Sequence, residues 1–120
     1  MQKLTTEHCL ALIEKGDFGP NILGVADAVA VVLTQSWCPQ WSWMRSYLSK
    51  LSQDEGREIF WIEYDLADCF EALMAFKERI FGNDQVPYVR YYQGGKLVAE
   101  SNYIDQGGFL RYLNKKAGAD

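Results

Sequence analysis

Residues 37–41, Trp-Cys-Pro-Gln-Trp, are the part of the sequence best suited to chemistry. They follow an apolar run (28–34) that is typical of a strand buried in a sheet, and Pro39 suits the first position of a helix, where no N–H is needed. Cys38 is then predicted at a helix N-terminus, where free backbone N–H groups and the helix dipole favour a thiolate. Since the thiolate is the nucleophile, we predict a reactive Cys38. The alternative is a small buried apolar side chain.

Periodicity and turn residues predict the elements that position this turn. Helices are expected at 5–16, from 39 to about 53–56, at 68–81 and from 105 or 106 to 116, with a loop at 17–24. Strands are expected at 28–34, 58–65, 87–93 and 96–103, the last two joined by Gly94-Gly95. The first βαβ units imply parallel strands, and the hairpin adds antiparallel ones. We therefore expect an α/β fold of three layers, a mixed central sheet with helices on both faces.

Length and composition limit the classes of function. The 120 residues fit a single domain spanning 1–120, and 48% hydrophobic with 23% charged residues argues against disorder. Twelve basic and sixteen acidic residues give a net charge of −4, which disfavours nucleic-acid binding. The apolar runs are far shorter than the roughly 20 residues that cross a bilayer, and residues 1–7 lack a secretory signal. We expect a cytoplasmic protein without membrane contact; its oligomeric state has no signature in the sequence.

Over almost its whole length the chain resembles the thioredoxin superfamily. The resemblance rests on Trp-Cys-Pro-Gln at 37–40, on Asp65 at the end of a strand, on Val86-Pro87 before the next strand, and on the hairpin at 91–98. It implies a three-layer thioredoxin-like fold and thiol–disulfide exchange with a disulfide-containing protein or a small thiol.

The resemblance also implies roles for individual residues. Cys38 would be the attacking thiol and Trp37 a flanking aromatic residue, with Pro39 opening the helix behind them. Pro87 would follow a cis peptide bond beside the thiol, although a proline considered alone is expected to be trans. The backbone of Val86 would then pair with an extended substrate.

Trp37 and Trp41 are expected to be partly exposed and to offer an apolar platform for a peptide or a small thiol. The predicted substrate-binding residues are thus Trp37, Pro39, Trp41, Val86 and Pro87.

The chain departs from the thioredoxin pattern at three positions. Trp41 stands where thioredoxins have their second cysteine, while Val32 and Trp61 replace a buried acid and the lysine that faces it. Without a thiol at position 41, a mixed disulfide on Cys38 cannot be resolved within the motif. The first strand of the full fold is also not recognisable before the first helix.

The other cysteines leave alternatives open. Cys69 is either a resolving thiol, able to form a Cys38–Cys69 disulfide switch, or a packing residue on the face of Leu73 and Phe76. Cys9 is interpreted as core packing. No cysteine pair has the spacing of a zinc site, and His8, the only histidine, is expected at the surface or in a cap.

Two functions remain in competition. The first is a monothiol thioredoxin-like protein that exchanges disulfides through Cys38, with no bound cofactor and with an external thiol such as glutathione as co-substrate. The second is a non-catalytic thioredoxin-fold module that holds an extended peptide or a partner protein beside Trp37, Trp41 and Pro87.

Overall fold

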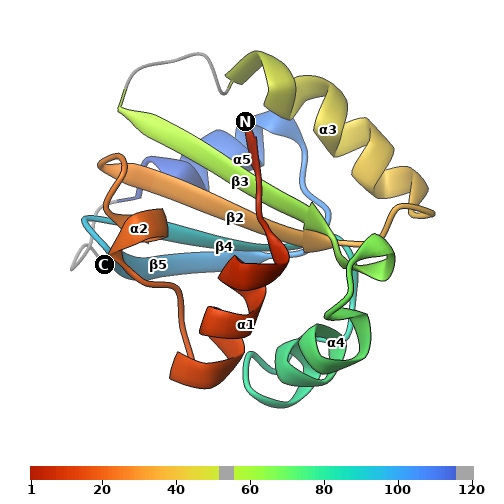
Figure 1. The fold of residues 1–120 in the computed structure, drawn as a ribbon. Coiled ribbons are helices and arrows are strands. Elements are labelled where there is room, and N and C mark those ends of the chain that lie inside the picture. The colour runs from red at the N-terminus through yellow and green to blue at the C-terminus, as the bar shows by residue number, and fades with distance from the viewer. Residues whose placement is uncertain (52–55, 116–120) are drawn as a thin grey trace.

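The computed structural model describes residues 1–51 and 56–115 and contains one five-stranded sheet (Figure 1). The strands lie in the order β1-β3-β2-β4-β5. The strands are β1 (Gln2–Lys3), β2 (Ala28–Thr34), β3 (Arg57–Glu63), β4 (Tyr88–Gln93) and β5 (Lys96–Ser101). The helices are α1 (Thr6–Lys15), α2 (Pro20–Leu23), α3 (Pro39–Leu51), the 3-10 turn η1 (Tyr64–Leu66), α4 (Phe70–Arg79) and α5 (Gln106–Leu113).

Strand β2 is the centre of the sheet. It pairs in parallel with β3 along its whole length, from Ala28 opposite Arg57 to Thr34 opposite Glu63. On its other edge β2 runs antiparallel to β4, and β4 runs antiparallel to β5. Every residue of β2 is buried, as its uninterrupted apolar sequence predicts for a strand covered on both faces.

Two separate cores cover the two faces of the sheet. Alternate β2 residues point to opposite sides, so Val31 belongs to one core and Val32 to the other. Helices α3 and α5 cover the Val32 face, while α1, α2 and α4 cover the Val31 face (Figure 1). The predicted three-layer α/β architecture with a mixed sheet is therefore confirmed.

The structure corrects several predicted elements. A strand does precede α1, but β1 has two residues, too few to produce a period in the sequence. The predicted loop at 17–24 contains the single turn of α2, which begins at Pro20. Strand β3 ends at Glu63 because the chain turns into η1 instead of continuing to Asp65.

The remaining differences concern the ends of elements. Helix α4 begins at Phe70 and ends at Arg79, β4 begins at Tyr88, and β5 ends at Ser101, each inside its predicted range. The last helix ends at Leu113, before the predicted end at Lys116, and Asn114 is its C-terminal cap. The predicted end of α3 beyond residue 51 falls mostly on 52–55, which lie outside the described residues, as does Lys116. Among the described residues, no helix is long and apolar enough to cross a membrane.

Candidate functional site at the start of helix α3

Cys38 lies at the N-terminus of α3, as the sequence predicts. Its carbonyl oxygen accepts a hydrogen bond from the Ser42 N–H at 3.3 Å, the first bond of the helix. Its own N–H donates to the Gln35 carbonyl, which closes the turn after β2. The side chain is 5% exposed, and its Sγ donates to the carbonyl oxygen of Val86 at 3.7 Å.

The strand pairing explains why Val86 lies beside Cys38. Leu33, near the end of β2, is opposite Tyr88, the first residue of β4. The turn that follows β2 therefore lies next to the segment that precedes β4. The Val86–Pro87 peptide bond in that segment is cis, as the resemblance to thioredoxins implies.

Asn102 fixes the segment that carries Pro87. Its side-chain Nδ2 donates to the Pro87 carbonyl at 3.0 Å and to Asn83 Oδ1 at 2.9 Å, and Asn83 Nδ2 donates back to Asn102 Oδ1 at 3.0 Å. Asn102 directly follows β5, whose Ser101 pairs with Val89 of β4. The predicted hairpin was the signal that could have located this residue, but sequence analysis did not identify it.

Lys77 of α4 also binds the segment before Pro87. Its Nζ donates to the Asn83 carbonyl oxygen at 2.9 Å, and the residue is almost fully buried. Burial lowers the pKa of Lys77, while the nearby Glu78 and Asp84 act against that shift. A buried lysine on a helix gives no distinctive pattern, so this role was not predicted.

The turn before Cys38 is fixed by η1. The Asp65 carboxylate accepts hydrogen bonds from Ser36 N–H at 2.8 Å and from Ser36 Oγ at 2.5 Å. Trp37 donates from Nε1 to Gln35 Oε1 at 2.6 Å. Its side chain is 66% exposed, so the expected exposure of Trp37 is confirmed.

The expected exposure of Trp41 is wrong, because its side chain is 1% exposed. It packs beside Trp61 of β3 with ring centroids 5.9 Å apart, and its Nε1 donates to Glu63 Oε2 at 3.0 Å. Long helical side chains point back over the preceding turn, and here that direction leads into the space between α3 and β3. Trp41 is thus part of the core and does not contribute to an exposed platform.

Two cationic side chains lie over the ring of Trp61. The Arg45 guanidinium lies 4.6 Å and the Lys3 Nζ 5.7 Å from its ring centroid. Trp61 pairs with the buried Val32 in the register of β3 and β2. The resemblance places the buried acid and the lysine of thioredoxins at Val32 and Trp61. These two positions are neighbours in the sheet, but they carry an apolar and an aromatic side chain.

A pocket of about 380 Å³ opens beside the Cys38 turn. Gln35, Trp37, Lys77 and Val86 are among the residues that line it. Of the predicted substrate-binding residues, Trp37 and Val86 thus line one cavity. Pro39 is the first residue of α3, and its contact with a substrate stays a prediction.

The structure does not bring Cys69 to Cys38. Cys69 precedes α4 and belongs to the core on the Val31 face, whereas Cys38 belongs to the core on the Val32 face. Cys9 of α1 lies with Cys69. His8 completes the N-terminal cap of α1, where its Nδ1 accepts the Thr5 N–H. Within residues 1–51 and 56–115, no three His, Cys, Asp or Glu side chains form a group able to hold a metal ion.

Comparison with solved structures identifies the architecture. Thioredoxin f2 of Chlamydomonas reinhardtii superimposes with a TM-score of 0.67 and 16% identity, over 95% of this chain and 94% of that one. The chain has a thioredoxin fold. Spinach chloroplast thioredoxin f gives a TM-score of 0.65 at 16% identity, covering 93% and 88% of the two chains. A mutant thioredoxin from Halobacterium salinarum gives 0.61 at 17% identity, covering 79% and 82%. No protein-family model and no curated protein matches the sequence.

Proposed function

We propose that the protein is a monothiol oxidoreductase that exchanges disulfides through Cys38 and depends on an external thiol to complete the reaction. The observation that carries this proposal is the position of the Cys38 sulfur, at the start of α3 and 3.7 Å from the Val86 carbonyl. The thiol and a stretch of backbone able to pair with an extended partner are thereby adjacent.

The first step forms a mixed disulfide. The Cys38 sulfur, after losing its proton, attacks one sulfur of the partner's disulfide; that bond breaks, and the other sulfur leaves and takes up a proton. The buried indole of Trp41 provides no second thiol in the first turn of α3.

An external thiol must therefore act next. One glutathione attacks the Cys38 sulfur and releases the partner's second thiol, which leaves glutathione on Cys38. A second glutathione attacks that glutathione sulfur, frees Cys38 and forms glutathione disulfide. In sum, one partner disulfide is reduced and two glutathione molecules are oxidised. The cytoplasm, where such thiols are kept reduced, is the proposed location.

The test is the reaction with glutathione disulfide, followed by intact mass. The native chain and the Cys69→Ser variant are expected to gain one glutathione, and the Cys38→Ser variant none. Digestion would place the adduct on Cys38. An adduct that persists in the Cys38→Ser variant, or no adduct in the native chain, would contradict the proposal.

A second candidate is the binding module, which the exposed face of Trp37 favours. A large aromatic side chain that remains 66% exposed beside a pocket is typical of a recognition surface. Cys38→Ser separates the two candidates. Unchanged capture of a protein partner by this variant under non-reducing conditions would favour the module, and loss of capture would favour thiol exchange.

A further inference from the structure

Helices α1 and α4 lie side by side on the sheet face opposite Cys38 (Figure 1). The core on that face contains both Cys9 and Cys69. Cys9 lies within α1 and is 0% exposed. Cys69 is the residue that caps the N-terminus of α4 and is 5% exposed. The sequence predicts core packing for Cys9, and for Cys69 either pairing with Cys38 or packing beside Leu73 and Phe76. In the fold, Cys69 is the neighbour of Cys9.

The two thiols are neighbours, since the nearby Cys69 adds to the effect of burial in raising the pKa of Cys9. Their backbones are held by the helices that carry them: Cys9 N–H donates to the Thr5 carbonyl at 3.2 Å, and the Cys69 carbonyl accepts the Leu73 N–H at 2.8 Å. The packing of α1 against α4 holds the two cysteines near one another. A disulfide bond would bring their sulfur atoms to roughly 2.05 Å.

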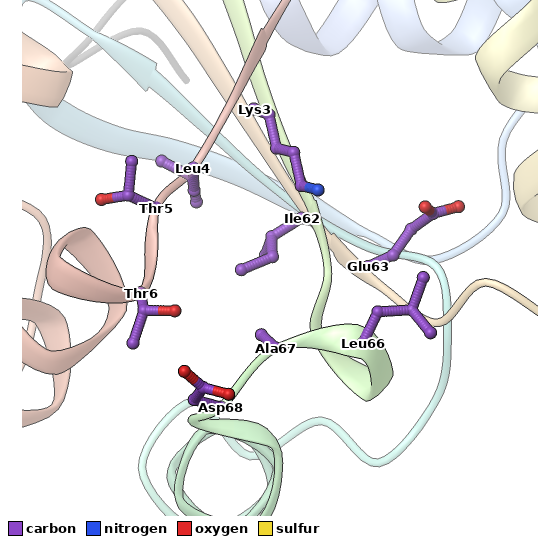
Figure 2. Close-up of a pocket in the computed structure, with 9 residues that line it drawn as sticks. All are labelled: Lys3, Leu4, Thr5, Thr6, Ile62, Glu63, Leu66, Ala67 and Asp68. Atoms are coloured by element: carbon purple, nitrogen blue, oxygen red, sulfur yellow. The ribbon is translucent and has the colours of Figure 1, made fainter.

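A pocket of about 410 Å³ is lined in part by residues that precede the two cysteines in the chain. Figure 2 shows Thr6, at the start of α1, facing Asp68, just before α4, across the pocket. Thr5 and Ala67 line the same pocket, so part of its wall consists of the segments that precede Cys9 and Cys69. Cys69 directly follows Asp68 and is the more exposed of the two cysteines.

We propose that Cys9 and Cys69 are a second redox site, which a hydroperoxide such as hydrogen peroxide converts into an intramolecular disulfide that joins α1 to α4. The Cys69 sulfur attacks the peroxide, the O–O bond breaks, and Cys69 becomes a sulfenic acid as one water leaves. The Cys9 sulfur then attacks the Cys69 sulfur and loses its proton, and the hydroxyl group departs as a second water. Two thiols and one peroxide give one disulfide and two waters.

The order of attack follows from the surroundings of the two thiols. Burial, and secondarily the neighbouring Cys69, raises the pKa of Cys9 to about 12, so Cys9 is a poor first nucleophile at neutral pH. The high pKa of Cys9 is less of an obstacle in the second step, because that step is intramolecular and the oxidised Cys69 sulfur is close by. This site goes beyond the proposed function, because it involves neither Cys38 nor an external thiol.

The test uses the Cys38→Ser variant, which keeps both cysteines and removes the exchange site. After incubation with hydrogen peroxide, its intact mass is expected to fall by two hydrogens, and digestion should yield Cys9- and Cys69-containing peptides joined within one chain. A matched variant with Cys9→Ser added should instead accumulate sulfenic acid on Cys69, detected with a cyclic diketone.

In this variant, the proposal would be overturned by an unchanged mass, by addition of oxygen without loss of hydrogen, or by a bridge between two chains. None of them bears on the reaction of Cys38 with glutathione disulfide, which is measured separately in the native chain. A bridge between Cys38 and Cys69 in the native chain would also contradict it, because it would show that Cys69 has a different partner.

Discussion

Cys38 and Cys69 are equally exposed, at 5% each, and both begin a helix, yet their surroundings differ. The Cys38 sulfur donates to a backbone carbonyl next to a pocket, with a tryptophan where a second thiol would lie. Cys69 is a neighbour of another thiol, Cys9, inside a core. Exposure therefore does not distinguish the two sites, but the groups that surround each thiol do. We propose that Cys38 reacts with another molecule and that Cys69 reacts with its neighbour Cys9 in the same chain.

The largest expected contrast is in alkylation by iodoacetamide, mapped by peptide mass. A pKa of about 12 for Cys9, against an ordinary value near 9, lowers the thiolate fraction about 1000-fold below pH 9. Cys9 should react at least that much more slowly in the folded chain than in urea, and its rate should increase about tenfold per pH unit up to about pH 12.

The raised pKa of Cys9 also makes the stability of the fold depend on pH in one direction. Because the pKa of Cys9 is higher in the folded than in the unfolded chain, this thiol lowers stability only as the pH rises from about 9 to about 12. Below pH 9 both the folded and the unfolded state hold the proton.

The alkylation experiment has a clear contradicting result. If iodoacetamide reacted with Cys9 at pH 8 as fast in the folded chain as in urea, the proposed difference between the Cys38 site and the Cys9–Cys69 site would be lost.

The next effect concerns the support of the Cys38 turn. Trp41→Phe removes part of a buried ring and the hydrogen bond to Glu63, and should lower the free energy of unfolding by about 1–3 kcal/mol, measured with urea. Trp43→Phe, two residues along and 60% exposed, is the matched control and should change it by less than about 0.5 kcal/mol. Equal losses in the two variants would show that Trp41 does not support the turn.

A smaller effect is expected at the Pro87 segment. Asn102→Ala removes the donor to the Pro87 carbonyl and the pairing with Asn83, and should cost about 1 kcal/mol and slow the reaction of Cys38 with glutathione disulfide several-fold. Asn114 is exposed, so Asn114→Ala serves as the control, and its reaction with glutathione disulfide is measured in the same way. If Cys38 reacted as fast in Asn102→Ala as in this control, Asn102 would not be required to position the Pro87 segment beside Cys38.

The parts of the fold that sequence reasoning recovered are those with strong local signals. The apolar run of β2, the Thr5 and Gly16 caps of α1, and the Gly94-Gly95 turn each specify their element locally. The same holds for Cys38, because the Cys-Pro sequence after a buried strand determines where the helix begins.

Other features depend on contacts between segments far apart in the sequence. The direction of Trp41 is decided by the space between α3 and β3, which a helix pattern does not reveal. The proximity of Cys9 to Cys69 results from the packing of α1 against α4, 60 residues along the chain. Asn102 reaches Pro87 only because β5 pairs with β4.

The most direct test of the central claim is the decay of a mixed disulfide formed between Cys38 and a disulfide-containing peptide. After removal of excess reagents, the complex is incubated with increasing concentrations of glutathione and followed by intact mass. The rate of peptide release should be proportional to the glutathione concentration and close to zero without it, since the chain places no second thiol at Trp41. Release at the same rate without glutathione would show that another cysteine of the chain resolves Cys38, and would contradict a monothiol mechanism.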